Sequence, residues 1–355
     1  LAGVGVVFKL IQAISMKLDL NEKEYLKYLD IVCIGTISDI VPLIDENRVI
    51  AKLGLKLVAQ TKNIGLKALL ELIGFKTIDS SAISFGVAPR INACGRMGNE
   101  QIALDLFLCK DKEQAQKLAN KLNEYNVERQ RIEKQIFEEA IEKIEINEKD
   151  KSCIIVGSEG WHHGIIGIVA SKVTDMYFKP SILICFEGKE GKGSGRSIPG
   201  FDLHEALMKC GNHLTKFGGH AMAVGVTVEK ADFEDFKNEL EEYAKTCKID
   251  EIVPILNIDS ELNLKNIDID SVKSLQKLEP FGEANKTPIF LLRNLKVNSI
   301  RALSDGKHLK LNLKEDNFMI DAIGFNMGEL SEKYMLDDRV DEVGCLDINS
   351  FYGRE

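Results

Sequence analysis

A carboxylate that closes an apolar run is the first candidate for chemistry. Asp39 follows the run from Ile31 to Ile37 and precedes Pro42. A carboxylate at the end of a buried element is held rigidly, and its oxygens suit a hard divalent cation such as Mg²⁺ or Mn²⁺. Periodicity does not tell whether this run is a strand or a buried helix. Because one carboxylate makes no metal site, the alternative is that Asp39 is a cap or turn residue.

Two arginines and an asparagine lie among proline and glycine in the segment 88–98. They are Arg90, Asn92 and Arg96. A guanidinium group binds phosphate oxygens through paired hydrogen bonds, and a nearby glycine lets the backbone approach a ligand closely. The segment therefore predicts a phosphate site, with solvated arginines in a surface loop as the alternative.

The only tryptophan stands beside two histidines directly before a predicted helix. Trp161, His162 and His163 lie between a predicted strand at 153–157 and a predicted helix at 165–176. This order is typical of ligand-binding junctions, where the free amides of a helix N-terminus attract anions. Zinc is not indicated, because no further ligands follow at suitable spacing.

Two glycine-rich segments follow, at 191–197 and 217–223. The first carries Ser194 and Arg196, and the second carries Gly218, Gly219 and His220. Bare amides, a hydroxyl, a guanidinium fork and a switchable donor are what a phosphate cradle needs. The spacing is not that of a Walker loop. A purely structural role for both turns is the alternative.

The composition restricts any polyanion site to a part of the surface. The 355 residues carry a formal net charge of −9, whereas binding of nucleic acid needs clustered Lys and Arg. With 45% apolar residues, the chain can bury a large core of two or three domains. No apolar run reaches the roughly 20 residues that span a bilayer. Eight cysteines without paired spacing suit a reducing cytosol, so we expect a cytoplasmic protein.

The residue patterns divide the chain into four parts. Residues 1–108 alternate apolar segments with glycine turns and indicate the later part of an α/β domain. Residues 109–149 contain a one-sided apolar stripe from 111 to 146, which predicts a long connector helix. Residues 150–250 begin as strand, helix and strand, a second α/β domain. Residues 251–355 carry short strands at about 10-residue spacing, which predict a small β-barrel or sandwich.

Taken in order, these segments resemble the RecJ branch of the DHH phosphoesterases over nearly the whole chain. The resemblance implies two α/β domains, the back part of the DHH domain and the DHH-associated domain, joined by the long helix. A C-terminal β-barrel of the oligonucleotide-binding (OB) type follows them. Asp39 falls on the fourth family motif. The other matching segments are Pro89 to Met97, Gly160 to Gly164, Gly193 to Ser197, Gly218 to His220 and Glu279 to Gly282.

The resemblance also implies a function. It is that of an exonuclease that hydrolyses phosphodiester bonds of single-stranded DNA from 5′ to 3′ with two Mn²⁺ or Mg²⁺ ions, in DNA repair and recombination. Asp39 would be a catalytic metal ligand. A single-strand binding protein and a helicase would be protein partners. The residues expected to hold DNA and its phosphates are Arg90, Asn92, Arg96, Trp161, His162, Ser194, Gly195, Arg196, Ser197, Gly218, Gly219 and His220.

The sequence departs from the family pattern in one respect. Asp-x-Asp and Asp-His-His, which name the family, are not in it, and His162 follows Trp161 in place of Asp. Both ends look cut, so we expect a fragment that lacks most of the metal site and hydrolyses nothing alone. One alternative is a DHH phosphodiesterase acting on nano-RNA or cyclic dinucleotides, which the long helix and the barrel disfavour. Another is a non-catalytic DNA-binding replication scaffold, which the retained Asp39, Arg196 and His220 disfavour.

Overall fold

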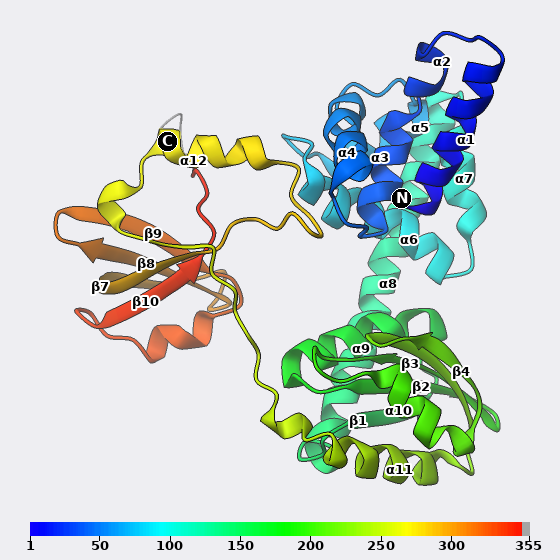
Figure 1. Ribbon diagram of the computed structural model, residues 1–355, viewed down its shortest axis with the longest axis vertical. Coiled ribbons are helices and arrows are strands. Elements are labelled where there is room, and N and C mark those ends of the chain that lie inside the picture. The colour runs from blue at the N-terminus through cyan, green and yellow to red at the C-terminus, as the bar shows by residue number, and fades with distance from the viewer. Residues whose placement is uncertain (350–355) are drawn as a thin grey trace. The chain divides into compact units, whose positions relative to one another are not determined.

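The structure is a computed structural model that describes residues 1–349, without the side chain of Asp250. It comprises two compact units. The first contains residues 1–60, 78–83 and the described residues from 256 onward, and the second contains residues 61–77 and 84–255. Figure 1 labels their helices and strands. The four-part division drawn from the sequence stays a prediction.

Residues 1–108 form helices and turns and contain no strand, although the alternating pattern had suggested an α/β domain. The run from Ile31 to Ile37 lies in a helix that is buried on nearly all sides, which is why its apolar residues show no one-sided stripe. This helix packs with its neighbours around Phe8, Tyr25 and Ile50. The helices of this region in the first unit are α1 (Gly3–Lys17), α2 (Lys23–Leu26), α3 (Leu29–Ser38) and α4 (Asp45–Val58).

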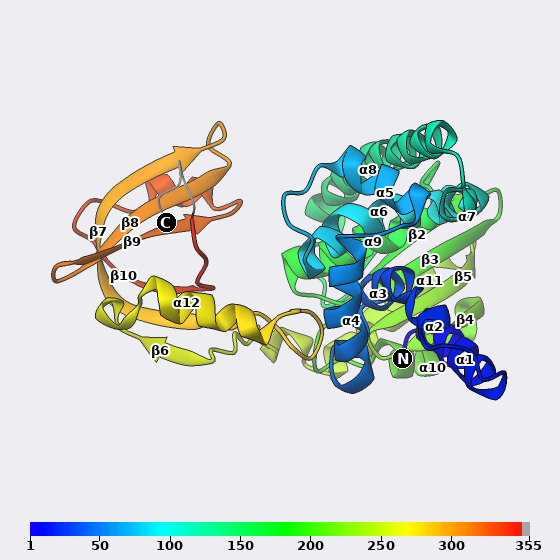
Figure 2. The same cartoon turned by 90° about the horizontal axis from the view of Figure 1, so that it is seen from above.

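The first unit also contains a curled sheet of half-barrel form (Figure 2). Its long strand β7 pairs with β10 and with β6 near its start, and with β8 toward its end. The described strands run in the order β10-β7-β8-β9. The elements are β6 (Ser260–Leu262), α12 (Ile269–Leu275), β7 (Phe290–Leu303), β8 (His308–Glu315), β9 (Phe318–Gly324) and β10 (Arg339–Gly344), with short 3-10 turns η4 (Leu264–Asn266), η5 (Gln276–Leu278) and η6 (Gly328–Glu332).

The second unit begins with helices, and the longest of them confirms the predicted long helix. α8 runs for 36 residues, and Asp111 caps it by accepting a 2.7 Å hydrogen bond from the backbone N–H of Gln114. Gly or Pro in the interior would destabilise a helix of this length, and α8 contains neither. Among the described residues, no helix is both long and apolar enough to cross a bilayer. The helices here are α5 (Ile64–Ile73), α6 (Ala88–Arg96), α7 (Glu100–Leu108) and α8 (Lys112–Asn147), and a π-turn η1 (Ala82–Val87) precedes α6.

A five-stranded sheet follows in the second unit, in the order β1-β2-β3-β5-β4. β1 and β2 are parallel, and the remaining neighbours are antiparallel. The predicted strand, helix and strand at the start of this sheet are confirmed. The elements are β1 (Ile154–Glu159), α9 (His163–Tyr177), β2 (Ser181–Glu187), β3 (Glu190–Arg196), α10 (Leu203–Cys210), η2 (Gly211–His213), β4 (Leu214–His220), β5 (Ala223–Glu229), α11 (Phe233–Thr246) and η3 (Ile249–Glu251).

The two faces of this sheet carry different layers. One face packs on α10 and α11 around Phe236, Leu240 and Val226. The other packs on α9 and the second half of α8 around Ile136, Val169 and Leu183. On β3 the residues alternate strictly. Gly191, Gly193 and Gly195 face the α10 side, where an added Cβ would lie within 2.7 Å of neighbouring side chains. The residues between them, and Arg196, therefore face the α9 side.

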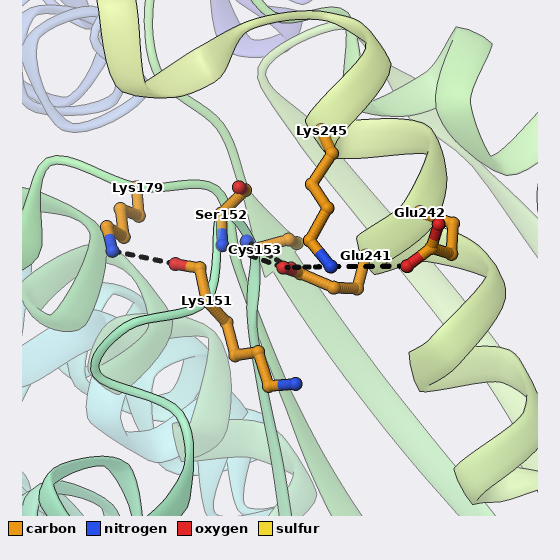
Figure 3. A network of polar contacts seen from close by, with 7 residues as sticks. All are labelled: Lys151, Ser152, Cys153, Lys179, Glu241, Glu242 and Lys245. Carbon is orange, nitrogen blue, oxygen red and sulfur yellow. Dashed lines mark hydrogen bonds and ion pairs between the residues drawn. The ribbon is translucent and has the colours of Figure 1, made fainter.

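The loop between α8 and β1 is tied to α11 by a buried carboxylate (Figure 3). Glu241 accepts hydrogen bonds from the backbone N–H groups of Ser152 at 3.2 Å and Cys153 at 3.1 Å. Glu148 forms a 2.8 Å ion pair with Lys237 at the same place. These contacts fix the point at which β1 begins, and so they join the end of α8 to the sheet.

Candidate functional site

The open half of the α9 side of the sheet carries a flat, cationic surface. The register of β3, β5 and β4 places nine residues there in three rows, in which directly opposite residues share a face. None of the nine is acidic. The rows are Lys192, Thr227 and Lys216; then Ser194, Gly225 and Gly218; then Arg196, Ala223 and His220.

Gly225 and Gly218 of the middle row form a floor without side chains. A Cβ added at Gly218 or Gly225 would meet nothing within 4 Å, so open space lies above both residues. Neighbouring strands lie about 4.8 Å apart, which places His220 about 10 Å from Arg196 across the floor. A phosphate or a sugar-phosphate backbone could therefore lie against the sheet between cations and bare backbone.

Arg196 is the fixed cation at the edge of this floor. Its Nη1 donates to the hydroxyl of Ser194 at 3.0 Å and to the carbonyl of Gly195 at 2.8 Å. Burial, and after it the charge of Arg96, lowers the pKa of the Arg196 guanidinium from its usual value. The Arg196 guanidinium is thus partly desolvated and lies near the like charge of Arg96. A bound anion would offset both unfavourable effects.

The N-terminus of α9 lies against two arginines, Arg96 and Arg196. The side chain of His162 caps this helix, since its Nδ1 accepts a 3.2 Å hydrogen bond from the backbone N–H of Gly164. A Cβ at Gly164 would lie 2.4 Å from the carbonyl oxygen of Arg96, and one at Gly167 would lie 3.3 Å from Nη2 of Arg196. Arg96 in turn donates to the carbonyl of Gly164 at 3.1 Å. Gly164 thus lets α9 approach the backbone of α6 at Arg96, and Gly167 leaves room for the guanidinium group of Arg196.

The structure adds residues of α8 and α9 that the sequence analysis missed. Glu133 is buried and forms ion pairs with Arg129 and Lys172. Burial, and then the charge of Arg129, lowers the pKa of Arg96, whereas Glu133 raises it. The available signal was the spacing of Arg129 and Glu133, four apart on a predicted helix, but this pattern is common on solvated helix faces.

Trp161 packs in the core, and its expected substrate contact stays a prediction. It is 5% exposed in the core between α8, α9 and the sheet. Its indole N–H donates to Oε2 of Glu139 at 2.8 Å. That bond, and then one from Gln135, lowers the pKa of the Glu139 carboxyl below its ordinary value of 4.5.

Because Trp161 is the chain's single tryptophan, this bond has an optical readout. The carboxylate of Glu139 has a lowered pKa in the folded state, so its contribution to stability is present above 4.5 and lost as the pH falls through the lowered value. We expect Trp161 fluorescence to stay constant down to pH 4.5 and to change only below it. The same titration of Glu139→Gln should lack this step, and identical curves for the two proteins would contradict the assignment.

The remaining predicted residues lie in more regular structure than expected. The segment 88–98 was expected as a loop, but Arg90 and Asn92 are within helix α6, which begins with Pro at its first turn. Arg90 donates to Asn123 at 2.9 Å and to the carbonyl of Gly86 at 2.8 Å, so its guanidinium is engaged in packing α6 on α8. Asn92 is exposed on α6.

The glycine-rich segment 191–197 was expected as a turn and is almost entirely the strand β3. Gly195 faces the α10 core, and Ser197 is buried with its hydroxyl donating to the carbonyl of Phe201 at 2.7 Å. Gly219 has a φ of +141°, and a Cβ there would lie 2.3 Å from the carbonyl oxygen of Ala223. Gly195, Ser197 and Gly219 therefore have structural roles in and beside the strands. The open face of the sheet carries four of the predicted residues, Ser194, Arg196, Gly218 and His220. Two more, Arg96 and His162, lie at the N-terminus of α9.

Asp39 lies in the first unit, where it ends helix α3 and is exposed. Among residues 1–349, no three side chains of His, Cys, Asp or Glu are grouped so that they could hold a metal ion. A single exposed carboxylate fits the role of one ligand and does not make a two-metal site.

Two family models match the chain: the DHHA1 domain matches residues 150–246, and the RecJ OB domain matches residues 258–355. The single-stranded-DNA-specific exonuclease RecJ of Bacillus subtilis is 37% identical over 361 residues, covering 100% of this chain and 45% of that protein. RecJ of Thermus thermophilus is 32% identical, covering 99% of this chain and 50% of that protein.

Solved structures agree with the sequence comparison. RecJ from Thermus thermophilus in complex with Mg²⁺ has a TM-score of 0.85 at 30% identity, covering 99% of this chain and 53% of that one. Its complex with Mn²⁺ has a TM-score of 0.84, also at 30% identity, covering 99% of this chain and 51% of that one. The chain spans about half the length of these relatives. Likeness in sequence and in fold over the full chain shows that this protein belongs to the RecJ family.

Proposed function

We propose that the open face of the second-unit sheet holds a terminal phosphate and the adjoining backbone of single-stranded DNA. The observation that carries this proposal is the register that places Arg196, Ser194 and His220 around a glycine floor. Arg196 would bind phosphate oxygens through the guanidinium donors that it does not use on Ser194 and Gly195. Arg96 and the positive end of the α9 dipole would favour the anion from the side.

We propose further that the whole protein is a single-strand-specific exonuclease that requires Mn²⁺ or Mg²⁺. This follows from the names of its RecJ relatives and from the ions in their solved structures. A divalent ion would activate water and stabilise the charge that develops on the phosphate. Asp39 would supply one carboxylate ligand. The residues of the sheet face would hold the phosphate end still while the adjoining bond is cut.

Finer assignments are part of the same proposal. Polarity from 5′ to 3′, a role in repair and recombination, and work beside a single-strand binding protein and a helicase rest on family resemblance. A cytoplasmic location is supported by the eight free thiols, six of which are buried.

The proposal is tested by measuring the binding of residues 1–355 to three labelled 15-mers by fluorescence anisotropy. These are a 5′-phosphorylated single strand, the same strand with a 5′-hydroxyl, and a blunt duplex. We expect the phosphorylated strand to bind about tenfold more tightly than the hydroxyl strand, the effect of one charge-assisted contact of about 1.4 kcal/mol. We expect no hydrolysis with Mn²⁺. Equal binding of the two single strands would contradict the phosphate site, and degradation of the strand would contradict the expected inactivity.

A further inference from the structure

Glu133 is a buried carboxylate at the centre of a cationic cluster. It lies on α8, is 5% exposed, and is not among the residues expected to touch substrate. Each of its oxygens has its own cation: Oε2 contacts Arg129 on the same helix, and Oε1 contacts Lys172 on α9. A buried charge persists only where it is paired in this way.

The two partners differ in their freedom. The side chain of Arg129 is 12% exposed and also donates to Oδ1 of Asn126 at 2.7 Å, which locks its guanidinium against α8. Lys172 is 52% exposed, and its long stem enters from the surface. Glu133 therefore links α8 to α9 through one buried and one flexible cation.

The cluster reaches the phosphate site through α9, because Lys172 is on this helix and Arg96 donates to the carbonyl of Gly164 in its first turn at 3.1 Å. Arg129 disfavours and Glu133 favours the charged form of Arg96, so both charges act on that guanidinium. Arg96 in turn acts on Arg196. Arg96, Arg129, Arg196 and Lys172 carry four positive charges and would repel one another without a carboxylate among them. This repulsion would weaken the hydrogen bond from Arg96 to the carbonyl of Gly164, which joins the arginine to the first turn of α9.

We propose that Glu133 is a positioning residue that holds Arg96 and the N-terminus of α9 in place for the terminal phosphate. The inference rests on the proposed function, because it assigns a role within the same phosphate site. Glu133 itself does not touch the phosphate. It lowers the repulsion among the cations while the site is empty, so that the guanidinium groups keep one arrangement before the anion arrives.

The role is tested with Glu133→Gln, which keeps the shape of the side chain and removes its charge. The readout is the ratio of dissociation constants for the 5′-hydroxyl and 5′-phosphorylated 15-mers, measured on residues 1–355. We expect the ratio to fall about fivefold. A purely structural role would lower the melting temperature and leave the ratio unchanged. A purely electrostatic role would tighten binding of the phosphorylated strand, because a negative charge has been removed. Either of these two results would overturn the proposal.

Matched variants complete the design. Glu145→Gln removes another carboxylate of α8, one that accepts from Tyr177 at 2.7 Å, and should leave the ratio as in the wild type. Arg129→Gln should lower the ratio, and the double variant should lose no more than the larger single loss, because the two residues act as one unit. Should Glu133→Gln fail to fold, Lys172→Met removes the exposed partner alone, and we expect a twofold to threefold fall in the ratio; an unchanged ratio would overturn the proposal. A wild type without phosphate preference would overturn the proposed function itself, whereas a preference that Glu133→Gln retains would overturn only the role of Glu133.

Discussion

Replacing Arg196 by alanine is expected to weaken binding of a 5′-phosphorylated single strand by about tenfold. The change removes a partly buried guanidinium that is already oriented by Ser194 and by the carbonyl of Gly195. A hydrogen bond to a charged group contributes about 1.5 kcal/mol or more, and about 1.4 kcal/mol corresponds to tenfold. Since the lost contact is to a phosphate, the slope of log K against log salt should also become shallower by about 0.7. Anisotropy titrations at several salt concentrations measure both quantities.

The control for this experiment is Arg131→Ala. Arg131 is another arginine of the second unit, but its side chain is 61% exposed on α8 and is paired with Glu128 at 2.8 Å. Its removal changes the net charge by the same amount and should alter binding less than twofold, as exposed ion pairs contribute little. If Arg196→Ala leaves the salt slope unchanged, or if both variants weaken binding equally, Arg196 has no direct phosphate contact.

Gly164→Ala is expected to have the second large effect, on both stability and binding. A Cβ at this position would lie 2.4 Å from the carbonyl oxygen of Arg96, and a backbone atom cannot rotate away as a flexible side chain does. α9 and the end of α6 must therefore move apart. We expect the free energy of unfolding to fall by about 1–3 kcal/mol, the usual effect of overpacking, and the melting temperature to fall by about 5 °C. The preference for the 5′-phosphate should fall about tenfold, because Arg96 loses its position against the first turn of α9.

Gly95→Ala provides the comparison for this substitution. Gly95 is one residue before Arg96 in α6, and a Cβ there would meet nothing within 4 Å. Alanine favours a helix over glycine, so this variant should be as stable as the wild type or slightly more stable. A wild-type melting curve for Gly164→Ala would show that α6 and α9 do not pack as closely as described.

The sequence was informative where one pattern dominated over many residues. The one-sided stripe of α8 and the strand, helix and strand around α9 were predicted almost to the residue. The run at Ile31 to Ile37 was ambiguous because a helix buried on nearly all sides and a buried strand are equally apolar. α3 packs closely on α4, where Gly54 lies against Cys33, and local pattern does not report such a contact.

The glycine content of β3 led to a wrong prediction of its secondary structure. β3 contains three glycines and was predicted as a turn, yet these glycines are needed because the side chains of Ile184, Val226 and Val224 already fill the space next to them. That requirement comes from strands distant in sequence. Glu133 was missed for a similar reason, since its partner Lys172 and its neighbour Arg96 lie on other elements. The chemistry of single residues was predictable, whereas their common location depended on the register of strands and on helix packing.

Residues alternate strictly along β3, so that one side of the strand faces the core and the other forms the proposed anion-binding surface. On its core side there is no side chain to repack, and on its open side Lys192 is exposed. Substitutions at Lys192 can therefore change which anion the surface accepts at little cost in stability. In evolutionary terms, the specificity of this surface can drift while the fold beneath it stays the same, and the same freedom is open to an engineer who wishes to retarget it.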